Sequence, residues 1–324
     1  VGVRMNIEIG RYWSKPWSLV DGCTPCSPGC DHCWSARMAY RFDKRCTNNL
    51  LIASSKGFTG KVIPRPDRLN IPLRTRKPTV FALWNDLFHE AVPASFIDDA
   101  YEVMAACPHH TFLILTKRAH NIMSQLYDVT ADCPIRELGG GDYLPNAWHG
   151  LTVCNQAEAD EKVPIFLQVP GNKFLSIEPM MGPVDIEPYL PLHGCRQCKF
   201  NHDNAPGCNR RPGMCSDFRP LHDGHIDAVV LGGETGPGAR PMHPDWVRSV
   251  RDQCAAAGVL PFFFKQWGEW AKDEAITGMT YFHRQDSKRI AMDDHTMMER
   301  VGRKKAGRHW MVERMMICRG GRKK

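Results

Sequence analysis

The stretch TFLILTKR, residues 111–118, shows the pattern on which the fold rests. An almost continuously apolar run, rich in β-branched and aromatic side chains, gives way at once to polar and charged residues. A short run of this kind suits a strand that is buried on both faces, as in a parallel sheet. We therefore predict a strand over Thr111–Leu115, with Thr116, Lys117 and Arg118 at its carboxyl end.

The same pattern recurs along the chain. The further runs are Thr79–Trp84, Ala147–Val153, Lys173–Ile177, Ile226–Leu231 and Pro261–Phe264. Each is followed by polar or glycine-rich residues, so each is predicted to be another buried strand.

Helical stretches separate several of these strands. Ser95 is expected to cap a helix, with Asp98 three residues later as its capping-box partner. Glu158–Val169 is expected to form a second helix, bent at its internal proline. A third follows His243–Pro244 and ends near Gly258, where a left-handed C-cap is expected.

The alternation of strands and helices predicts an α/β fold with right-handed crossovers. Six clear strands, with a further strand expected before Cys23, suit a full or partial (βα) TIM-like barrel. We expect this barrel to span residues 1–276 and to be interrupted at 190–225 by a Cys-rich insertion without apolar periodicity. Residues 277–324 lack the strand–helix rhythm and are expected to form an extension with a basic tail.

Polar residues follow every predicted strand, and barrel enzymes build their sites from the loops at these strand ends. The candidates for substrate binding or proton transfer are Asp86, Lys117, Lys265 and Gln266. The candidates for holding a cofactor are Glu178, Gly232, Gly233 and Glu234. Glycine lets the backbone approach a ligand closely, and the carboxylate after it can hold an amino group or a ribose. Ordinary loop polarity and a tight structural turn are the alternatives.

The first cysteine cluster reads GCTPCSPGCDHCWS over residues 22–35 and contains Cys23, Cys26, Cys30 and Cys33. Thiolates bind soft metals and iron–sulfur clusters. Three thiolates on a 4Fe–4S cluster leave one iron open, which can chelate the amino and carboxylate groups of S-adenosylmethionine. Reductive cleavage of that cofactor would yield the 5′-deoxyadenosyl radical. The alternative is a structural zinc site made by all four cysteines.

A second cysteine cluster lies within the insertion. Its members are Cys195, Cys198, Cys208 and Cys215. Four thiolates in a loop without a core of its own indicate a structural zinc ion that folds the loop. A second, fully ligated iron–sulfur cluster and no metal at all are the alternatives.

The net charge of +7 is concentrated at one end of the chain. Residues 300–324 carry ten Lys or Arg and one acid, a net of +9, which leaves −2 for the rest. This tail is expected either to touch DNA or RNA or to be a solvated terminus. Since the sequence contains no apolar run of about 18 residues and no signal-peptide pattern, we expect no membrane partner and a cytoplasmic location.

At the first cysteine cluster the chain resembles the phage-associated three-cysteine-motif family, whose function is unknown and which is similar to the radical S-adenosylmethionine barrel superfamily. The resemblance runs from Asn6 to about Trp310. It rests on motifs that include GCTPCSPGCDHCW, FLILTKR, FLSIEPMMGPV, VVLGGETGPGARPMHPDWVRSVRDQC and PFFFKQWGEW. The family pattern C-x6-C-x2-C carries over to Cys23, Cys30 and Cys33. This chain departs from it by adding Cys26, which leaves the first ligand open between Cys23 and Cys26.

The resemblance implies a radical enzyme that uses a 4Fe–4S cluster, S-adenosylmethionine and an electron donor. It implies no substrate, although a nucleic acid or nucleotide is suggested by analogy with other members of the superfamily. The alternative is a non-catalytic, zinc-containing protein that binds nucleic acid.

Overall fold

The structure is a computed structural model. It describes residues 11–43, 51–126, 143–191, 224–259, 261–272, 288–292, 294 and 296–307. The second cysteine cluster therefore lies outside the described residues, as do most of the insertion and most of the basic tail.

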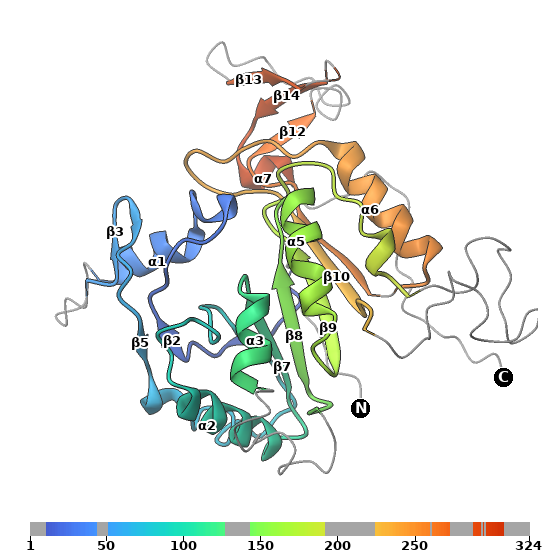
Figure 1. Cartoon of the computed structure of the whole chain (residues 1–324). Coiled ribbons are helices and arrows are strands. Elements are labelled where there is room, and N and C mark those ends of the chain that lie inside the picture. Colours follow the sequence, from blue (N-terminus) through green and yellow to red (C-terminus); the bar gives the residue numbers. More distant parts are fainter. Residues whose placement is uncertain are drawn as a thin grey trace, which may run out of the picture.

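One sheet of seven strands organises the molecule, in the order β1-β6-β7-β8-β9-β10-β11 (Figure 1). The strands are β1 Lys15–Pro16, β6 Val80–Leu83, β7 Thr111–Thr116, β8 Ala147–Thr152, β9 Asn172–Ile177, β10 Ala228–Gly232 and β11 Phe262–Gln266. Every neighbouring pair is parallel. The six predicted strands are confirmed, and the strand expected before Cys23 is the short β1. Interleaved with helices, the sheet forms a half-barrel, so the α/β prediction holds in its partial TIM-like form.

Helices connect the strands and cover one face of the sheet (Figure 1). They are α1 Trp34–Asp43, α2 Ala94–Ala105, α3 Ala119–Leu126, α5 Gln156–Phe166, α6 Pro244–Ala256 and the short α7 Arg303–Ala306. Single 3-10 turns occur at η2 Pro28–Cys30, η3 Pro66–Arg68 and η4 Glu187–Tyr189.

The predicted helix starts need two corrections. The N-cap of α2 is Pro93, in an extended conformation, so Ser95 lies inside the first turn and no capping box forms. Helix α5 begins two residues earlier than predicted because the side chain of Asn155 accepts a hydrogen bond from the Glu158 amide at 3.0 Å. The end of α6 is as predicted, with Gly258 at a φ of +67°.

The main core lies between the sheet and its helices and includes Phe112 and Ile114 of β7. Strands β6 and β10 are buried throughout, but β7 alternates between buried and half-buried residues. The expectation that every strand is buried on both faces was therefore wrong for β7 and for β11, in which only Gln266 is buried. In an open half-barrel the concave face meets a cavity instead of a second layer, and Leu113 and Leu115 line that cavity.

Smaller sheets complete the fold. Two antiparallel pairs join β2 Val20–Asp21 to β5 Ile63–Pro64, and β3 Ala53–Ser54 to β4 Gly57–Phe58. A three-stranded antiparallel sheet has the order β12-β14-β13. Its strands are β12 Trp270–Lys272, β13 Arg289–Ala291 and β14 Met297–Arg300. The described part of the chain contains no helix long and apolar enough to cross a membrane.

Candidate functional site

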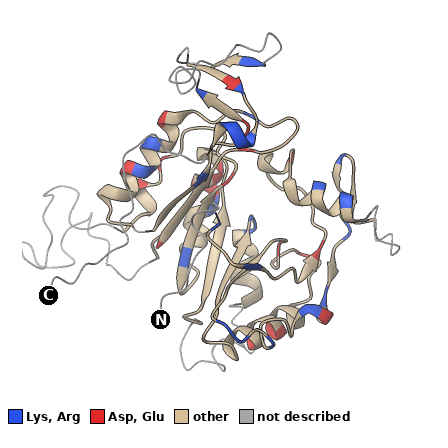
Figure 2. Ribbon diagram, turned by 180° about the vertical axis from the view of Figure 1, so that it is seen from behind, with Lys and Arg blue, Asp and Glu red and all other residues tan. Residues whose placement is uncertain are grey.

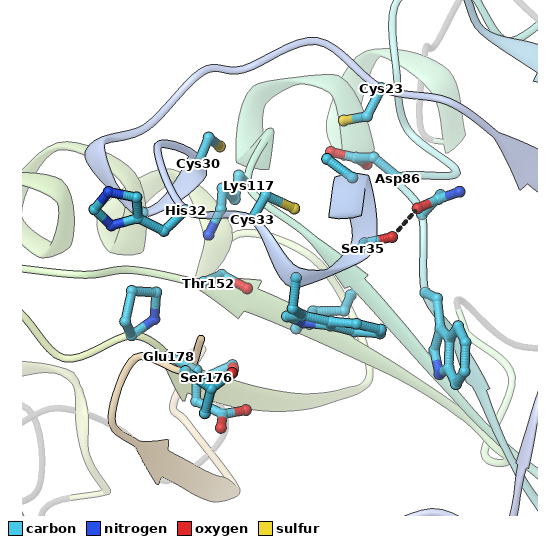
Figure 3. Close-up of a pocket in the computed structure, with 18 of the residues that line it drawn as sticks. Cys23, Cys30, His32, Cys33, Ser35, Asp86, Lys117, Thr152, Ser176 and Glu178 are labelled. Atoms are coloured by element: carbon cyan, nitrogen blue, oxygen red, sulfur yellow. Dashed lines mark hydrogen bonds between the residues drawn. The ribbon is translucent and has the colours of Figure 1, made fainter. Parts of the chain in front are cut away.

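A cavity of about 750 Å³ opens at the carboxyl ends of the parallel strands. The loop of residues 23–33, here called the cysteine loop, covers one side of it, and its four cysteines all line the cavity. The predicted strand-end residues that line the same cavity are Asp86, Lys117, Glu178, Gly233, Glu234, Lys265 and Gln266. Gly232 is not among the lining residues. Figure 3 shows Cys23, Cys30 and Cys33 on the loop, across from Ser176 and Glu178 on the strand ends.

Local hydrogen bonds wind the cysteine loop tightly. The side chain of Ser27 caps the turn η2 by accepting from the Gly29 amide at 3.1 Å. The Cys33 amide donates to the Cys30 carbonyl at 3.2 Å, and the Cys33 carbonyl accepts the first bond of α1, from Arg37 at 3.3 Å. Cys30 and Cys33 are therefore fixed by the backbone turns that lead into the helix.

Gly29 lets this loop rest directly on the strand ends. A Cβ atom on Gly29 would lie 2.3 Å from the Sγ atom of Cys154 and 3.1 Å from the Cδ atom of Pro179. Cys154 follows β8 and Pro179 follows β9, so any larger residue would lift the loop off the sheet. Cys154 thus packs beside the cysteine loop without lining the cavity.

A buried arginine holds the first half of the loop. Arg118, which is 3% exposed, donates to the Thr24 carbonyl at 3.0 Å and to the Thr24 hydroxyl at 2.7 Å. Its guanidinium also pairs with Asp86 at 2.8 Å and with Glu90 at 2.9 Å. Asp86 is further engaged, because its Oδ1 atom accepts from the hydroxyl of Thr116 at 2.7 Å.

A second arginine holds the other half of the loop. Arg240 donates to the Pro28 carbonyl at 2.9 Å and pairs with Asp31 at 3.3 Å. It also contacts both carboxylate oxygens of Glu234, at 2.7 and 2.9 Å. The Nδ1 atom of His32 lies 3.2 Å from the same carboxylate. The hydrogen bonds lower the pKa of Glu234 below its usual value, although burial acts to raise it.

The sequence suggests that Asp86 acts on a substrate and that Glu234 holds a cofactor, but the structure places both carboxylates among protein hydrogen-bond donors. Both are buried, and arginines and neighbouring donors occupy their oxygens. In this structure they anchor the arginines that hold the cysteine loop.

The glycine-rich loop after β10 also packs against the cysteine loop and α1. A Cβ atom on Gly236 would meet the guanidinium of Arg37, and one on Gly238 would lie 2.7 Å from the His32 ring. Both residues have positive φ angles, of +92° and +77°. The close approach expected of these glycines is thus an approach to protein side chains.

Other polar groups on the concave side remain open to a ligand. Lys265 pairs with both oxygens of Glu178, at 3.1 and 3.2 Å. The Oγ atom of Ser176 and the Oε1 atom of Gln266 are buried and have no hydrogen-bond partner among the described residues, and both residues line the cavity. Because buried polar atoms are seldom left unpaired, these two atoms indicate that a polar ligand completes the site.

The thiols of the loop differ in their electrostatics. A hydrogen bond with Cys26 lowers the pKa of Cys30 to about 6, against the effect of burial. Burial, followed by the charge of Asp86, raises the pKa of Cys23 to about 11. Lys117 has no ion-pair partner among the described residues, and its charge acts to lower the pKa of Cys30.

The spacing of the sulfurs bears on the metal that they could bind. No three of the four cysteines in the loop have sulfurs within 4.8 Å of one another. A tetrahedral zinc site with Zn–S bonds of about 2.3 Å requires sulfurs about 3.8 Å apart. A cubane cluster is less demanding, because each thiolate binds a different iron.

Among the described residues, His243, Asp245 and Asp294 do bring their ligand atoms within 4.8 Å of one another. The Nδ1 atom of His243 accepts a hydrogen bond from the Asp245 amide at 3.1 Å. The Nε2 atom of His243 lies 3.0 Å from a carboxylate oxygen of Asp294 but makes no hydrogen bond to any described residue.

Sequence reasoning did not single out His32, Arg118, Arg240 or Ser176 for their roles in this site. Arg118 and Arg240 stand within the motifs FLILTKR and GGETGPGARP, so each lies just after a strand end. Their contacts with a loop about one hundred or two hundred residues away leave no local signal. Cys195, Cys198, Cys208 and Cys215 lie outside the described residues, so their predicted zinc site stays a prediction.

Comparison with known proteins gives one match. The family model described as "Protein of unknown function (DUF5131)" matches residues 7–315. No curated protein and no solved structure matches the chain. Since the family model covers nearly the whole chain, including the cysteine loop and all seven strands of the half-barrel, the protein belongs to the DUF5131 family of proteins of unknown function.

Proposed function

We propose that this protein is a radical S-adenosylmethionine enzyme whose cysteine loop holds a 4Fe–4S cluster. The observation that carries the proposal is the position of the loop. Four cysteines line one cavity at the carboxyl ends of a parallel half-barrel, where barrel enzymes carry out their chemistry. When bound, the cluster would supply an electron to the sulfonium of S-adenosylmethionine and so generate a carbon radical.

Cys30 and Cys33 would be two of the ligands, with Cys23 or Cys26 as the third. Because no three of the four sulfurs lie within 4.8 Å of one another, the loop suits a cluster, in which each thiolate binds a different iron, better than a single zinc ion. The rigid turn around η2 and the two arginines that hold the loop keep it close to the strand ends. These contacts would orient the thiols before a metal arrives.

The polar groups opposite the loop suit the cofactor that the cluster would use. Ser176 and Gln266 offer buried oxygens without partners, and the Glu178–Lys265 pair offers both charges. S-adenosylmethionine carries an ammonium, a carboxylate and ribose hydroxyls, which need this mixture of donors and acceptors. Ser176, Glu178, Lys265 and Gln266 are therefore the residues that we assign to binding this cofactor.

Anaerobic reconstitution with iron and sulfide tests the proposal. We expect about four irons and four sulfides in the first cluster. With a reductant, the reconstituted protein should convert S-adenosylmethionine to 5′-deoxyadenosine. Two zinc ions and no iron would instead favour the non-catalytic, nucleic-acid-binding alternative. An intact cluster that fails to cleave the cofactor would refute the enzyme.

Single substitutions then identify the ligands. Cys30→Ala and Cys33→Ala should each abolish the cluster, whereas only one of Cys23→Ala and Cys26→Ala should do so. Cys107→Ala is the matched control, because Cys107 is buried at the end of α2 and does not line the cavity.

A further inference from the structure

Three tryptophans stand in a row along one side of the cavity. The ring of Trp84, directly after β6, contacts Trp34 at 5.2 Å and Trp13 at 5.5 Å between centroids. The interplanar angles are 80° and 75°, so the rings meet edge to face and hold one another in fixed orientations. All three line the cavity, and we call them the tryptophan wall. Trp34 keeps 43% of its surface exposed.

The wall stands at the opposite edge of the sheet from the open polar groups. Trp13 precedes β1 and Trp84 follows β6, the first two strands in the sheet order, whereas Ser176 is the penultimate residue of β9 and Gln266 ends β11. The cysteine loop leads directly into the wall, because Trp34 follows Cys33 in the chain. The cavity thus has a polar side and an aromatic side, and the four cysteines of the loop line it as well.

The charges that line the cavity favour an anion. Every carboxylate that lines the described cavity is paired with a basic side chain, namely Asp31, Asp86, Glu178 and Glu234. Four basic lining residues have no carboxylate partner within the described ranges: Arg11, Lys56, Lys117 and Arg303. Arg11 instead lies over the ring of Trp13, at 5.0 Å from its centroid. Figure 2 shows basic residues on α7 and on the β3–β4 hairpin, which carry Arg303 and Lys56.

We propose that the tryptophan wall binds a nucleobase whose phosphate groups are held by the unpaired basic side chains that line the same cavity. Aromatic rings that stack on bases, combined with basic side chains that follow the phosphates, are the usual means of binding unpaired nucleotides. This inference depends on the proposed function in one respect only: the bound nucleotide would be the substrate of the proposed radical enzyme. The mode of binding itself needs no catalysis.

The experiment uses the full reconstituted protein without reductant, so that binding is measured without turnover. Fluorescence anisotropy follows a labelled oligothymidylate of about eight nucleotides. An abasic strand of the same length measures the phosphate contribution alone. Unlabelled thymidine monophosphate, added as a competitor, shows whether a single free nucleotide suffices or a strand is required, and either result fits the proposal.

Trp34→Ala and Trp84→Ala should each weaken oligothymidylate binding by roughly 5- to 150-fold, the range found when a stacking ring is removed. Trp34→Phe should restore most of the affinity, because it keeps a ring. The matched control is Phe42→Ala, since Phe42 is exposed on the same helix and does not line the cavity. Its affinity should stay within about twofold of the wild type.

Three results would overturn the inference. The abasic strand could bind as tightly as the oligothymidylate. Trp34→Ala and Trp84→Ala could also leave the affinity for the oligothymidylate unchanged. S-adenosylmethionine could also displace the strand, and Trp34→Ala could weaken the binding of S-adenosylmethionine as much as that of the strand. The wall would then be a site for the adenine of that cofactor. Base-dependent binding by a protein that never cleaves S-adenosylmethionine would refute the proposed function and leave this inference standing.

Discussion

Replacing Arg118 by leucine should destabilise the protein and loosen the cysteine loop together. The side chain is 3% exposed and contacts Asp86, Glu90 and Thr24. Its loss leaves the buried carboxylate of Asp86 without a countercharge, and breaking a buried ion pair in this way costs about 3–5 kcal/mol. The exposed Glu90 adds little, because solvent screens its pairing.

Equilibrium urea unfolding measures the global effect, and hydrogen exchange of the amides of residues 24–33 measures the local one. Asp86→Asn should lower the unfolding free energy less in the Arg118→Leu background than in the wild type. The difference, which is the coupling energy between the two side chains, should be about 0.5–3 kcal/mol because they interact directly. Arg248→Leu is the control. It breaks an exposed pair with Asp245, which is worth about 0–1 kcal/mol. A loss below about 1 kcal/mol in Arg118→Leu, or unchanged exchange in the loop, would refute the anchoring role.

Three further predictions follow from single contacts. Burial lowers the pKa of His149 to about 3. As the pH falls below about 6.5, this histidine therefore becomes protonated in the unfolded chain but stays neutral in the folded chain. Between pH 7 and pH 4.5 the unfolding free energy of the wild type should fall by about 2–3 kcal/mol more than that of His149→Gln. The pKa of Glu234 is lowered by its hydrogen bonds, so the stability it contributes is present above about pH 4.3 and is lost as the pH falls through the pKa of the folded state. In urea unfolding below about pH 4.3, the unfolding free energy of Glu234→Gln should therefore fall less steeply with decreasing pH than that of the wild type. Equal slopes of unfolding free energy against pH would contradict this prediction. Gly29→Ala should push the loop against the Sγ atom of Cys154 and cost about 1–3 kcal/mol in urea unfolding, whereas Gly182→Ala, which has open space around it, should cost less than 1 kcal/mol.

The strands could be predicted from the sequence because the apolar pattern of each strand is a property of neighbouring residues. The runs Thr111–Leu115 and Ile226–Leu231 are apolar apart from Thr111 and Asp227, a pattern typical of strands that pack into a core. In the main sheet the strands also stand in their order along the chain, from β1 and β6 to β11. Helix starts were less readable, because one prolyl residue before α2 moved its cap from Ser95 to Pro93.

The composition of the site was also present in the sequence. Residues such as Glu178, Lys117, Lys265 and Gln266 follow strands, and the carboxyl ends of parallel strands meet at one edge of the sheet. Their gathering on one cavity follows from this topology. The spacing of Cys30 and Cys33 likewise places both thiols on successive turns before α1.

The sequence by itself determined the alternating α/β fold, the polar strand ends and the short loop of cysteines, because strand patterns and thiol spacing are properties of neighbouring residues, whereas it left a full and a partial barrel open. Only the tertiary structure decided what each polar group does. Arg118 and Arg240 reach Thr24 and Pro28 across 94 and 212 residues of chain, and they occupy Asp86 and Glu234 as they do so. A side chain's hydrogen-bond partners are set by distance in space, and the same carboxylate can anchor a loop or bind a ligand depending on which donor lies nearest.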